Sequence, residues 1–556
     1  MVVRNANLPT RRDFLRITGV AGASVLFGAA CSDGSNGSET AVDDTSADTG
    51  GEGSDATADT SADTTADTSA DTTADTTADT IADTTADTTP AEYVEPEAGW
   101  PACDLAATTQ TVTFVHVNDA HGNFAPLKDG KSPAARARGY FDKVKRENPF
   151  SLFTNGGDDF EKGSVAELRS SGQATLDYLE AMNYDVRCIG NHDFAWSADS
   201  VLDFTRAGSG KVVCSNVEYT GANPERWGAL PFTSITVGCL TIGFFSLVSK
   251  PWNERNEQYT GDFFATDFPA RWDWSERARE IVTAHRSEVD LMVCISHLGN
   301  GGDEELAAEV DGIDVILGAH SHTVLMREEL VNNTIIIQCG SSLGWVGRLD
   351  LDFDLTTRAL TTHRYRMTPN IPGTLPESPR VAQAMTEMLE RHAPNAHTTI
   401  ARCTRPLTAA GVADLTSRAA IEVAGVDAAM TDTTTVWTTW GAEGITEQDL
   451  ADTYKVERQP AGTPGFNGFY TAEVTGEALE LIRQSANDRW RFAGPATIDP
   501  TATYRIAVQK ILVFNADVYL LPGVVFGSEA FFLEAWELLE RFGRLRAAAG
   551  LPFNEA

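Results

Sequence analysis

The stretch TVTFVHVNDAHGN at residues 111–123 holds the pattern that decides the fold. Its apolar, β-branched first half is typical of a buried strand, and Asp119 and His121 follow where that strand would end. Loops at strand ends are where a rigid sheet presents functional side chains. The stretch therefore predicts a strand that carries a carboxylate and an imidazole to one edge of a sheet.

Further along the chain, the same arrangement recurs after the runs SLFTNG, DVRCI, LMVCIS and IDVIL. The polar blocks that follow these runs, together with the block that holds Asp119 and His121, contain half of the ten histidines. Each block alone also fits an ordinary turn or a surface histidine. Together, Asp, Asn and His side chains on converging loops predict a metal site for Mn, Fe, Zn or similar divalent ions. The later blocks are Gly157-Asp158, Gly190-Asn191-His192-Asp193, His297 and Gly318-Ala319-His320-Ser321-His322.

In the order D-x-H, G-D, G-N-H, H and G-x-H-x-H, these blocks resemble the calcineurin-like metallophosphoesterases. The branch they resemble most is the 5′-nucleotidase family, which includes UDP-sugar hydrolases and Sox-type thiosulfohydrolases. The resemblance covers about 109–370 and is weak beyond. It implies an α/β protein, with a four-layer α/β/β/α metallophosphoesterase sandwich followed by a smaller C-terminal α/β substrate domain.

The resemblance also implies a role for each polar residue. Asp119, His121 and His322 would bind one divalent ion, and Asp158 would bridge two. Asn191, His297 and His320 would complete the second site. Two such ions, about 3.5–4 Å apart, clamp phosphate oxygens and turn a bridging water into hydroxide. His192 would not bind metal but would stabilise the transition state or protonate the leaving alcohol.

The chain departs from that family directly after His192. Nucleotidases usually continue with Glu-Phe-Asp, and that Asp orients the imidazole, whereas this chain continues with Asp193-Phe194-Ala195. We therefore expect His192 to lack its usual partner, which affects its tautomer but not metal binding. Asp159 is expected to be a turn or supporting carboxylate rather than a ligand.

The C-terminal region resembles the family's substrate domain only in part. Phe466, in Pro464-Gly465-Phe466-Asn467, matches a Phe that stacks on the nucleotide base in nucleotidases, with a core aromatic as the alternative. Thr433–Thr438 stands where nucleotidases carry a substrate-holding Arg. The remaining candidates for substrate contact are Phe514, Trp437 and Trp440, of which the two Trp residues fit core packing equally well.

Residues 1–31 resemble an export signal. Arg11-Arg12-Asp13-Phe14-Leu15-Arg16 is similar to a twin-arginine motif, and the apolar run that follows is too short to span a bilayer permanently. Gly28-Ala29-Ala30-Cys31 resembles a lipobox, so Cys31 is a candidate for lipidation and membrane anchoring. The alternative is a soluble exported protein cleaved near Ala30. The sequence thus predicts a location in the periplasm or at the cell surface.

Residues 32–98 are predicted to be a disordered tether. Asp recurs at every fourth position from Asp59 to Asp87, where a helix would stack like charges, and large apolar residues are lacking. Residues 33–90 hold 15 acids and no base, and they contribute to the net charge of −36. This acidic balance argues against nucleic-acid binding, which requires a basic surface.

The rest of the chain is too long for one core. Strand-like runs alternate with helix-like segments at Ala134–Glu147, Ser170–Met182, Arg271–Ser287 and Glu304–Val310, and Arg348–Arg366 reads as a hairpin. A Pro-rich break follows at 369–376, and a helix is expected at Arg380–Arg391. We therefore predict a metallophosphoesterase domain at 99–370 and a degenerate 5′-nucleotidase-type domain at 371–556.

Cysteine positions leave one disulfide candidate, Cys103 with Cys403, because these two flank the catalytic region. The spacing alone does not establish this pair. The others beyond the signal lie in strand-like runs, where buried thiols are usual. They are Cys188, Cys214, Cys239, Cys294 and Cys339.

Three functions remain open from the sequence. The first is a metal-dependent phosphohydrolase that cleaves a small phosphate ester, such as a 5′-nucleotide, outside the cytoplasm. The second is a thiosulfohydrolase-like enzyme that cleaves a carrier-bound sulfonate with the same metals. The third is a non-catalytic surface binding protein, which fits poorly because every expected ligand position is filled. The oligomeric state is not indicated.

Overall fold

The structure is a computed structural model that describes residues 93–161, 163–250, 262–442, 444–454, 467–514, 516 and 520–554. The predicted signal at 1–31 lies outside the described residues, and so does the predicted tether up to residue 92. Phe466 also lies outside them.

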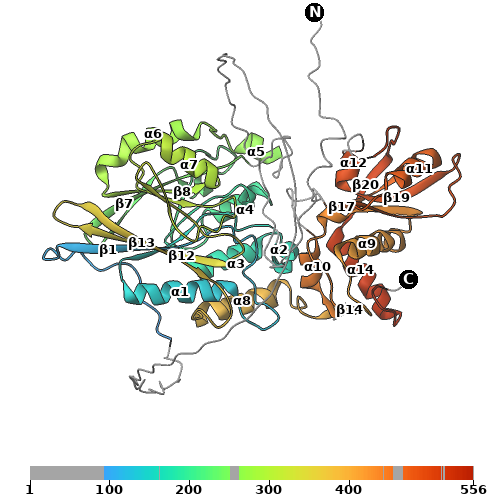
Figure 1. The fold of residues 1–556 in the computed structure, drawn as a ribbon, viewed down its shortest axis with the longest axis horizontal. Coiled ribbons are helices and arrows are strands. Elements are labelled where there is room, and N and C mark those ends of the chain that lie inside the picture. The colour runs from blue at the N-terminus through green and yellow to red at the C-terminus, as the bar shows by residue number, and fades with distance from the viewer. Residues whose placement is uncertain are drawn as a thin grey trace, which may run out of the picture. The chain divides into compact units, whose positions relative to one another are not determined.

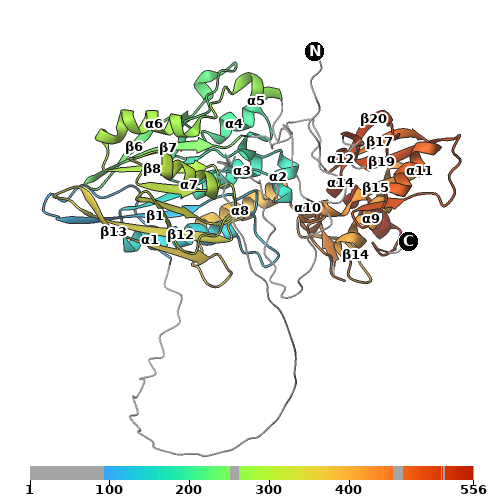
Figure 2. The ribbon, with the colours of Figure 1, turned by 45° about the horizontal axis from the view of Figure 1, so that its top comes forward.

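Two β-sheets form the centre of the first part of the chain (Figure 1). One sheet has seven strands in the order β13-β12-β1-β2-β3-β4-β5. Its strands are β1 (Thr109–Val117), β2 (Ser151–Asn155), β3 (Val186–Cys188), β4 (Lys211–Val213), β5 (Ala229–Leu230), β12 (Trp345–Asp354) and β13 (Ala359–Pro369). Figure 2 shows β12 and β13 beside β1, and their antiparallel pairing confirms the predicted hairpin.

The second sheet has six strands in the order β10-β11-β9-β8-β7-β6. Its strands are β6 (Thr233–Val237), β7 (Leu240–Val248), β8 (Leu291–His297), β9 (Val315–Gly318), β10 (Glu329–Val331) and β11 (Thr334–Gln338). The two sheets share one buried apolar core, in which the ring of Phe114 from β1 lies edge-on to that of Phe244 from β7, with centroids 6.2 Å apart. The two sheets thus pack face to face, and this packing removes one apolar face of each sheet from water.

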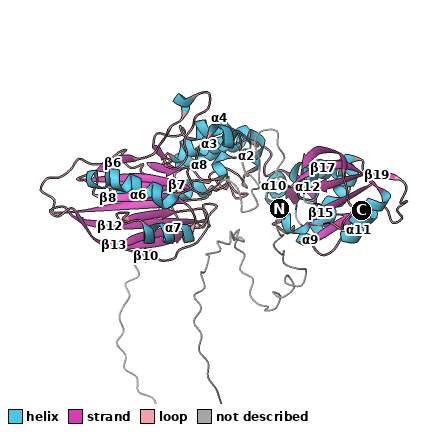
Figure 3. Ribbon diagram, turned by 90° about the horizontal axis from the view of Figure 1, so that it is seen from above, coloured by secondary structure: helices cyan, strands magenta, loops and turns pink. Residues whose placement is uncertain are grey.

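Helices cover the outer face of each sheet. The first sheet is covered by α1 (Pro133–Glu147), α3 (Gln173–Met182) and α8 (Pro379–His392). The second is covered by α6 (Trp274–His285) and α7 (Asn300–Glu309), which Figure 3 shows over the strands. Helix, sheet, sheet and helix are the four layers that the sequence predicts, so the predicted fold class is confirmed. Three short helices lie on the connections: α2 (Val165–Ser170), α4 (Ala198–Phe204) and α5 (Asp262–Asp267).

The C-terminal part forms a second α/β domain around a five-stranded sheet in the order β18-β15-β19-β17-β20. These strands are β15 (Ala428–Asp432), β17 (Gly468–Thr475), β18 (Trp490–Ala493), β19 (Thr503–Gln509) and β20 (Gly527–Glu534). A small pair, β14 (Thr399–Arg402) and β16 (Gly444–Thr446), lies apart from that sheet. The helices are α9 (Ala409–Ala424), α10 (Glu447–Thr453), α11 (Gly476–Ser485), α12 (Lys510–Phe514) and α14 (Ala535–Ala548). The domain limits that the sequence suggests, at 98/99 and 370/371, remain predictions.

The disulfide candidate from the sequence is wrong. Cys103 is bonded to Cys239, which the sequence assigned to a buried strand, while Cys403 is a buried free thiol. Cys239 instead occupies the turn between β6 and β7, where it can reach the segment before β1. Pairing across a fold depends on which loops meet, and sequence spacing does not contain that information.

Among the described residues, each helix is either too short or too polar to cross a membrane.

Candidate metal centre

Six of the predicted ligands form two clusters at one edge of the paired sheets. Asp119, His121 and His322 form one cluster, and Asp158, His297 and His320 form the other. Within each cluster, one donor atom of every residue lies within 4.8 Å of the others. Parallel strands end at the same edge, so loops distant in sequence meet there.

The two clusters share their carboxylates. Asp158 Oδ2 lies 3.0 Å from Nε2 of His297 and 3.7 Å from Nε2 of His121, so it faces both clusters. Asp119 Oδ1 lies 3.4 Å from Nε2 of His322 and 4.0 Å from Nε2 of His297. This geometry is what a carboxylate between two neighbouring ions requires.

Asn191 belongs to the second cluster. Its Oδ1 lies 3.2 Å from Nε2 of His297 and accepts a hydrogen bond from the Ser249 hydroxyl at 3.3 Å. Ser249 also lies 3.4 Å from Nδ1 of His320. The amide oxygen therefore faces the same space as the second set of donor atoms.

The backbone at the site adopts a conformation that most residues avoid. Five of the predicted ligands have positive φ angles, between 47° and 74°. Such angles cost free energy for a residue with a Cβ, and they cluster at functional sites where the surroundings enforce them. The five are Asp119, His121, Asp158, His320 and His322.

Two glycines of the predicted motifs allow the loops to approach this closely. A Cβ on Gly157, whose φ is +80°, would lie 2.4 Å from the Gly190 nitrogen. A Cβ on Gly190 would lie 2.1 Å from Oδ1 of Asp158. The Gly before Asp158 and the Gly before Asn191 are thus required by steric exclusion.

The loop at residues 156–161 orients two of the imidazoles. Nδ1 of His297 lies 2.6 Å from the Gly156 carbonyl oxygen, and Nδ1 of His121 lies 3.1 Å from the Phe160 carbonyl oxygen. A carbonyl only accepts, so each Nδ1 carries the proton and donates it. Nε2 of each ring is then the nitrogen that faces the centre of the site and is left to bind a metal ion.

Asp193 holds this loop in place. Its carboxylate accepts hydrogen bonds from the backbone N–H groups of Asp158 at 2.9 Å, Asp159 at 2.8 Å and Gly190 at 2.8 Å. Asp159 itself is fully buried and accepts from the Asn155 amide at 2.9 Å. Asp159 thus lies in a supporting position, as the sequence suggests.

The donor atoms fit divalent cations. Asp119 Oδ1 is buried and has no hydrogen-bond partner among the described residues, although the two clusters contain four imidazoles. Burial lowers the pKa of His297, but the carboxylates of Asp158 and Asp119 outweigh it and raise that pKa to about 10. The carboxylates thus attract positive charge to this space, and a metal ion would replace the proton there.

The sequence model for the calcineurin-like phosphoesterase family matches residues 112–324. These residues form a calcineurin-like phosphoesterase domain. The match spans the donor residues from Asp119 to His322, and the domain is a hydrolase domain, as the sequence predicts.

Similarity to curated proteins covers about half of the chain. The chain is 27% identical over 283 residues to the trifunctional nucleotide phosphoesterase protein of Bacillus subtilis, which covers 44% of this chain and 18% of that protein. It is 21% identical over 313 residues to the 5′-nucleotidase of Bos taurus, covering 51% of this chain and 52% of that protein. The chain therefore spans about half or less of the length of these relatives.

Two solved structures have the same overall fold, including a second domain. A 5′-nucleotidase precursor from Thermus thermophilus superimposes with a TM-score of 0.59 at 19% identity, covering 78% of this chain and 96% of that one. The sulfate thiohydrolase SoxB of the same genus gives a TM-score of 0.55 at 17% identity, covering 83% and 96%. At these identities the similarity concerns the fold alone.

In the phosphoesterase domain, His192 lacks the usual carboxylate at position 195 but has another partner. Nδ1 of His192 is hydrogen-bonded to the carboxylate of Glu161. Both side chains are buried, and the ring of His192 lies edge-on to that of His121, with centroids 5.2 Å apart. In the sequence, Glu161 is marked by its position three residues after Asp158. No motif predicts the loop conformation that turns its side chain back to His192.

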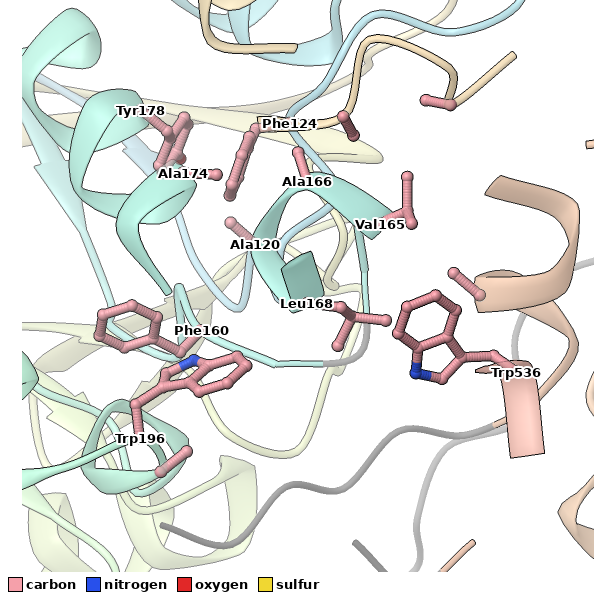
Figure 4. Close-up of a cluster of buried hydrophobic side chains, with 14 of the residues drawn as sticks. Ala120, Phe124, Phe160, Val165, Ala166, Leu168, Ala174, Tyr178, Trp196 and Trp536 are labelled. Carbon is pink, nitrogen blue, oxygen red and sulfur yellow. The ribbon is translucent and has the colours of Figure 1, made fainter. Parts of the chain in front are cut away.

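The packing below this loop is aromatic. Figure 4 shows Phe160 beside Trp196, and both contact the position of a Cβ on Gly172. Phe124 stacks on Tyr178 with ring centroids 4.5 Å apart.

Ser249 is a further residue that sequence reasoning missed, because a lone serine after β7 carries no pattern.

The structure describes the side chains of two of the four C-terminal candidates, Trp437 and Trp440. Phe514 ends α12, but its side chain is not among those that the structure describes. No part of Phe466 is described. Trp440 is buried, donates to the Thr453 hydroxyl and stacks on Phe553, so it belongs to the core. Trp437 is 50% exposed.

The stretch that replaces the family's Arg motif begins as a short 3₁₀ turn, Thr433–Thr435, directly after β15. Asp432, the last residue of that strand, is fully buried and forms an ion pair with Arg489 at 2.8 Å. An arginine therefore lies close to this turn, but its charge is balanced by Asp432.

Proposed function

We propose that this protein is an exported, metal-dependent phosphohydrolase that releases phosphate from 5′-nucleotides or related small phosphate esters. The observation that carries the proposal is the pair of donor clusters joined by Asp158 inside a phosphoesterase domain. Asp119, His121 and His322 would hold one divalent ion. Asp158, Asn191, His297 and His320 would hold the other, with Asp158 shared.

Two bound ions supply positive charge for the phosphate oxygens and a hydroxide nucleophile at neutral pH. The chain itself supplies orientation. The carbonyl groups of Gly156 and Phe160 direct His297 and His121, and Asp193 fixes the loop that carries Asp158. His192 lies beside His121 without belonging to either cluster, which suits a group that donates a proton to the leaving alcohol.

The substrate class is proposed from the relatives. The similar curated proteins are a nucleotide phosphoesterase and a 5′-nucleotidase. The acidic chain, at a net charge of −36, would bind an anionic ester through its metals rather than through a basic surface. Phe466 and Phe514 are the proposed contacts to the base.

Export is proposed from residues 1–31 and from the disulfide. The twin-arginine-like signal and the candidate lipid site at Cys31 direct the chain to the periplasm or cell surface. The disulfide between Cys103 and Cys239 suits an oxidising compartment.

The test is hydrolysis of AMP, ATP, UDP-glucose and bis(p-nitrophenyl) phosphate with Mn²⁺, for the wild type and Asp158→Ala. Phosphate is measured for AMP and ATP, UMP for UDP-glucose and p-nitrophenol for the diester. Turnover of nucleotides that is lost in the variant supports the proposal. Turnover of the diester alone keeps the metal centre but excludes nucleotide specificity. Asp142→Asn is a matched control, since Asp142 is also a buried carboxylate but pairs with Arg138 on α1.

A second candidate is hydrolysis of a carrier-bound sulfonate. The fold similarity to SoxB and the replacement of the substrate-holding Arg by Thr433–Thr438 favour it. Two bound metals with no hydrolysis of any of these esters would make this the better hypothesis.

A further inference from the structure

The loop at residues 156–161 contacts a third imidazole besides those of His121 and His297. Glu161, its last residue, is hydrogen-bonded through its carboxylate to Nδ1 of His192. The carboxylate is fully buried, and the imidazole side chain is only 9% exposed. A hydrogen bond to a carboxylate that is shielded from water in this way orients a ring much more strongly than an exposed one does.

Glu161 is held in place from two sides. Its backbone N–H donates to Oε1 of Glu167 at 2.7 Å, and the indole N–H of Trp196 donates to the same oxygen at 3.0 Å. Asp193 accepts from the backbone N–H of Phe160, the residue before it. Glu161 adopts a φ of 70°, a conformation that a residue with a side chain rarely takes without such support.

Ala195 stands where the related nucleotidases carry the carboxylate that orients the equivalent imidazole. It follows His192 by three residues in a 3₁₀ turn (His192–Phe194), and its N–H donates to the His192 carbonyl oxygen at 3.0 Å. Side chains three residues apart eclipse in such a turn, so position 195 and His192 share a face. In this chain the methyl of Ala195 provides no acceptor there.

We propose that Glu161 is the positioning residue of the reaction and takes over the role that position 195 has lost. It accepts the hydrogen bond that Nδ1–H of His192 donates, fixes the ring and leaves Nε2 directed at the substrate. This inference rests on the proposed function. When the ester P–O bond breaks, its electron pair stays on the alcohol oxygen, which takes the Nε2 proton. The water whose oxygen joins the phosphorus returns a proton to the imidazole.

The first experiment compares two substrates in Glu161→Gln. The leaving group of AMP is an alcohol that must be protonated, whereas p-nitrophenolate leaves without a proton. We expect kcat for AMP to fall about 10- to 100-fold with KM unchanged, and kcat for p-nitrophenyl phosphate to fall clearly less. Metal content stays at the wild-type value. An equal loss on both substrates, loss of metal, or unchanged kcat for AMP would overturn the proposal.

A second variant tests the exchange of positions. In Glu161→Gln combined with Ala195→Asp, the carboxylate returns to the position used in the related nucleotidases, and kcat for AMP should recover while that for p-nitrophenyl phosphate changes little. Asp142→Asn is the control for loss of a buried carboxylate and should affect both substrates alike. If the double variant unfolds, the substrate comparison above still decides.

The contact between Glu161 and His192 can also be detected by NMR spectroscopy, without measuring enzyme activity. In protein labelled with ¹⁵N-histidine, a hydrogen-bonded Nδ1–H resonance that disappears in His192→Asn belongs to His192. We expect it in the wild type and expect it to shift or vanish in Glu161→Gln. Its absence from the wild type would refute the role of Glu161. A wild type that shows it but hydrolyses neither ester would refute the phosphohydrolase function and leave the contact established.

Discussion

The loops around the metal centre and the loops of the C-terminal sheet differ in how closely their residues are constrained. At the metal centre, the imidazoles of His121 and His297 are fixed by carbonyl oxygens, and Asp158 carries a positive φ angle. In the C-terminal domain, the turn after β15 is a short run of threonines, and Trp437 is half exposed.

This difference follows from the chemistry of the two regions. A two-metal site accepts few ligand types, and each must point to within a fraction of an ångström of one position. A substrate-binding surface can use many different aromatic or polar contacts with similar affinity. The reaction type is therefore readable in the first region, whereas substrate choice depends on the second.

The largest expected effect is removal of metal. Protein stripped with a chelator should lose all phosphate release, and Mn²⁺ should restore it, because the ligands alone provide no nucleophile. Metal analysis by mass spectrometry should find two ions per chain in the wild type and fewer in His297→Ala. Full activity in metal-free protein would show that the reaction does not use this metal centre. The difference drawn between the two regions would then not hold.

The next effect is loss of the imidazole outside the clusters. His192→Ala should reduce kcat for AMP by about 10²- to 10⁴-fold while metal content is retained, because general acid catalysis typically contributes that much. Steady-state kinetics together with metal analysis check this. Loss of a metal ion from this variant would instead make His192 a ligand.

The third effect concerns the scaffold of the phosphoesterase domain. Replacing both Cys103 and Cys239 by Ser should lower the free energy of unfolding by about 2–4 kcal/mol, since the bond closes a long loop, with 136 residues of sequence separation. Urea unfolding measures this. Cys403→Ser, at a buried free thiol, is the comparison and should show a smaller loss.

The smallest effect is expected in the C-terminal domain. Phe466→Ala should raise KM for AMP roughly 2- to 10-fold and leave that for p-nitrophenyl phosphate unchanged, if the ring stacks on the base. Phe531→Ala, at a partly exposed aromatic on β20, is the control. Equal KM values for both variants would show that base recognition does not use Phe466.

The helices and strands of the first domain follow closely from sequence patterns. The predicted segment Ala134–Glu147 corresponds to α1 at Pro133–Glu147, and the predicted hairpin corresponds to β12 and β13. Local patterns suffice here because helix caps and strand alternation are encoded in neighbouring residues. For example, the Ser132 hydroxyl accepts the N–H of Ala135 at the start of α1.

The sequence by itself determined the donor types, their order and the loops that carry them, since D-x-H, G-D, G-N-H and G-x-H-x-H each encode local geometry. Only the tertiary structure decided which partners these residues meet. Cys103 bonds to Cys239 and not to Cys403, and Glu161 supplies the carboxylate that Ala195 lacks. The physical reason is that both contacts join segments whose proximity is set by sheet packing and by a strained loop, neither of which leaves a periodic signal in the chain.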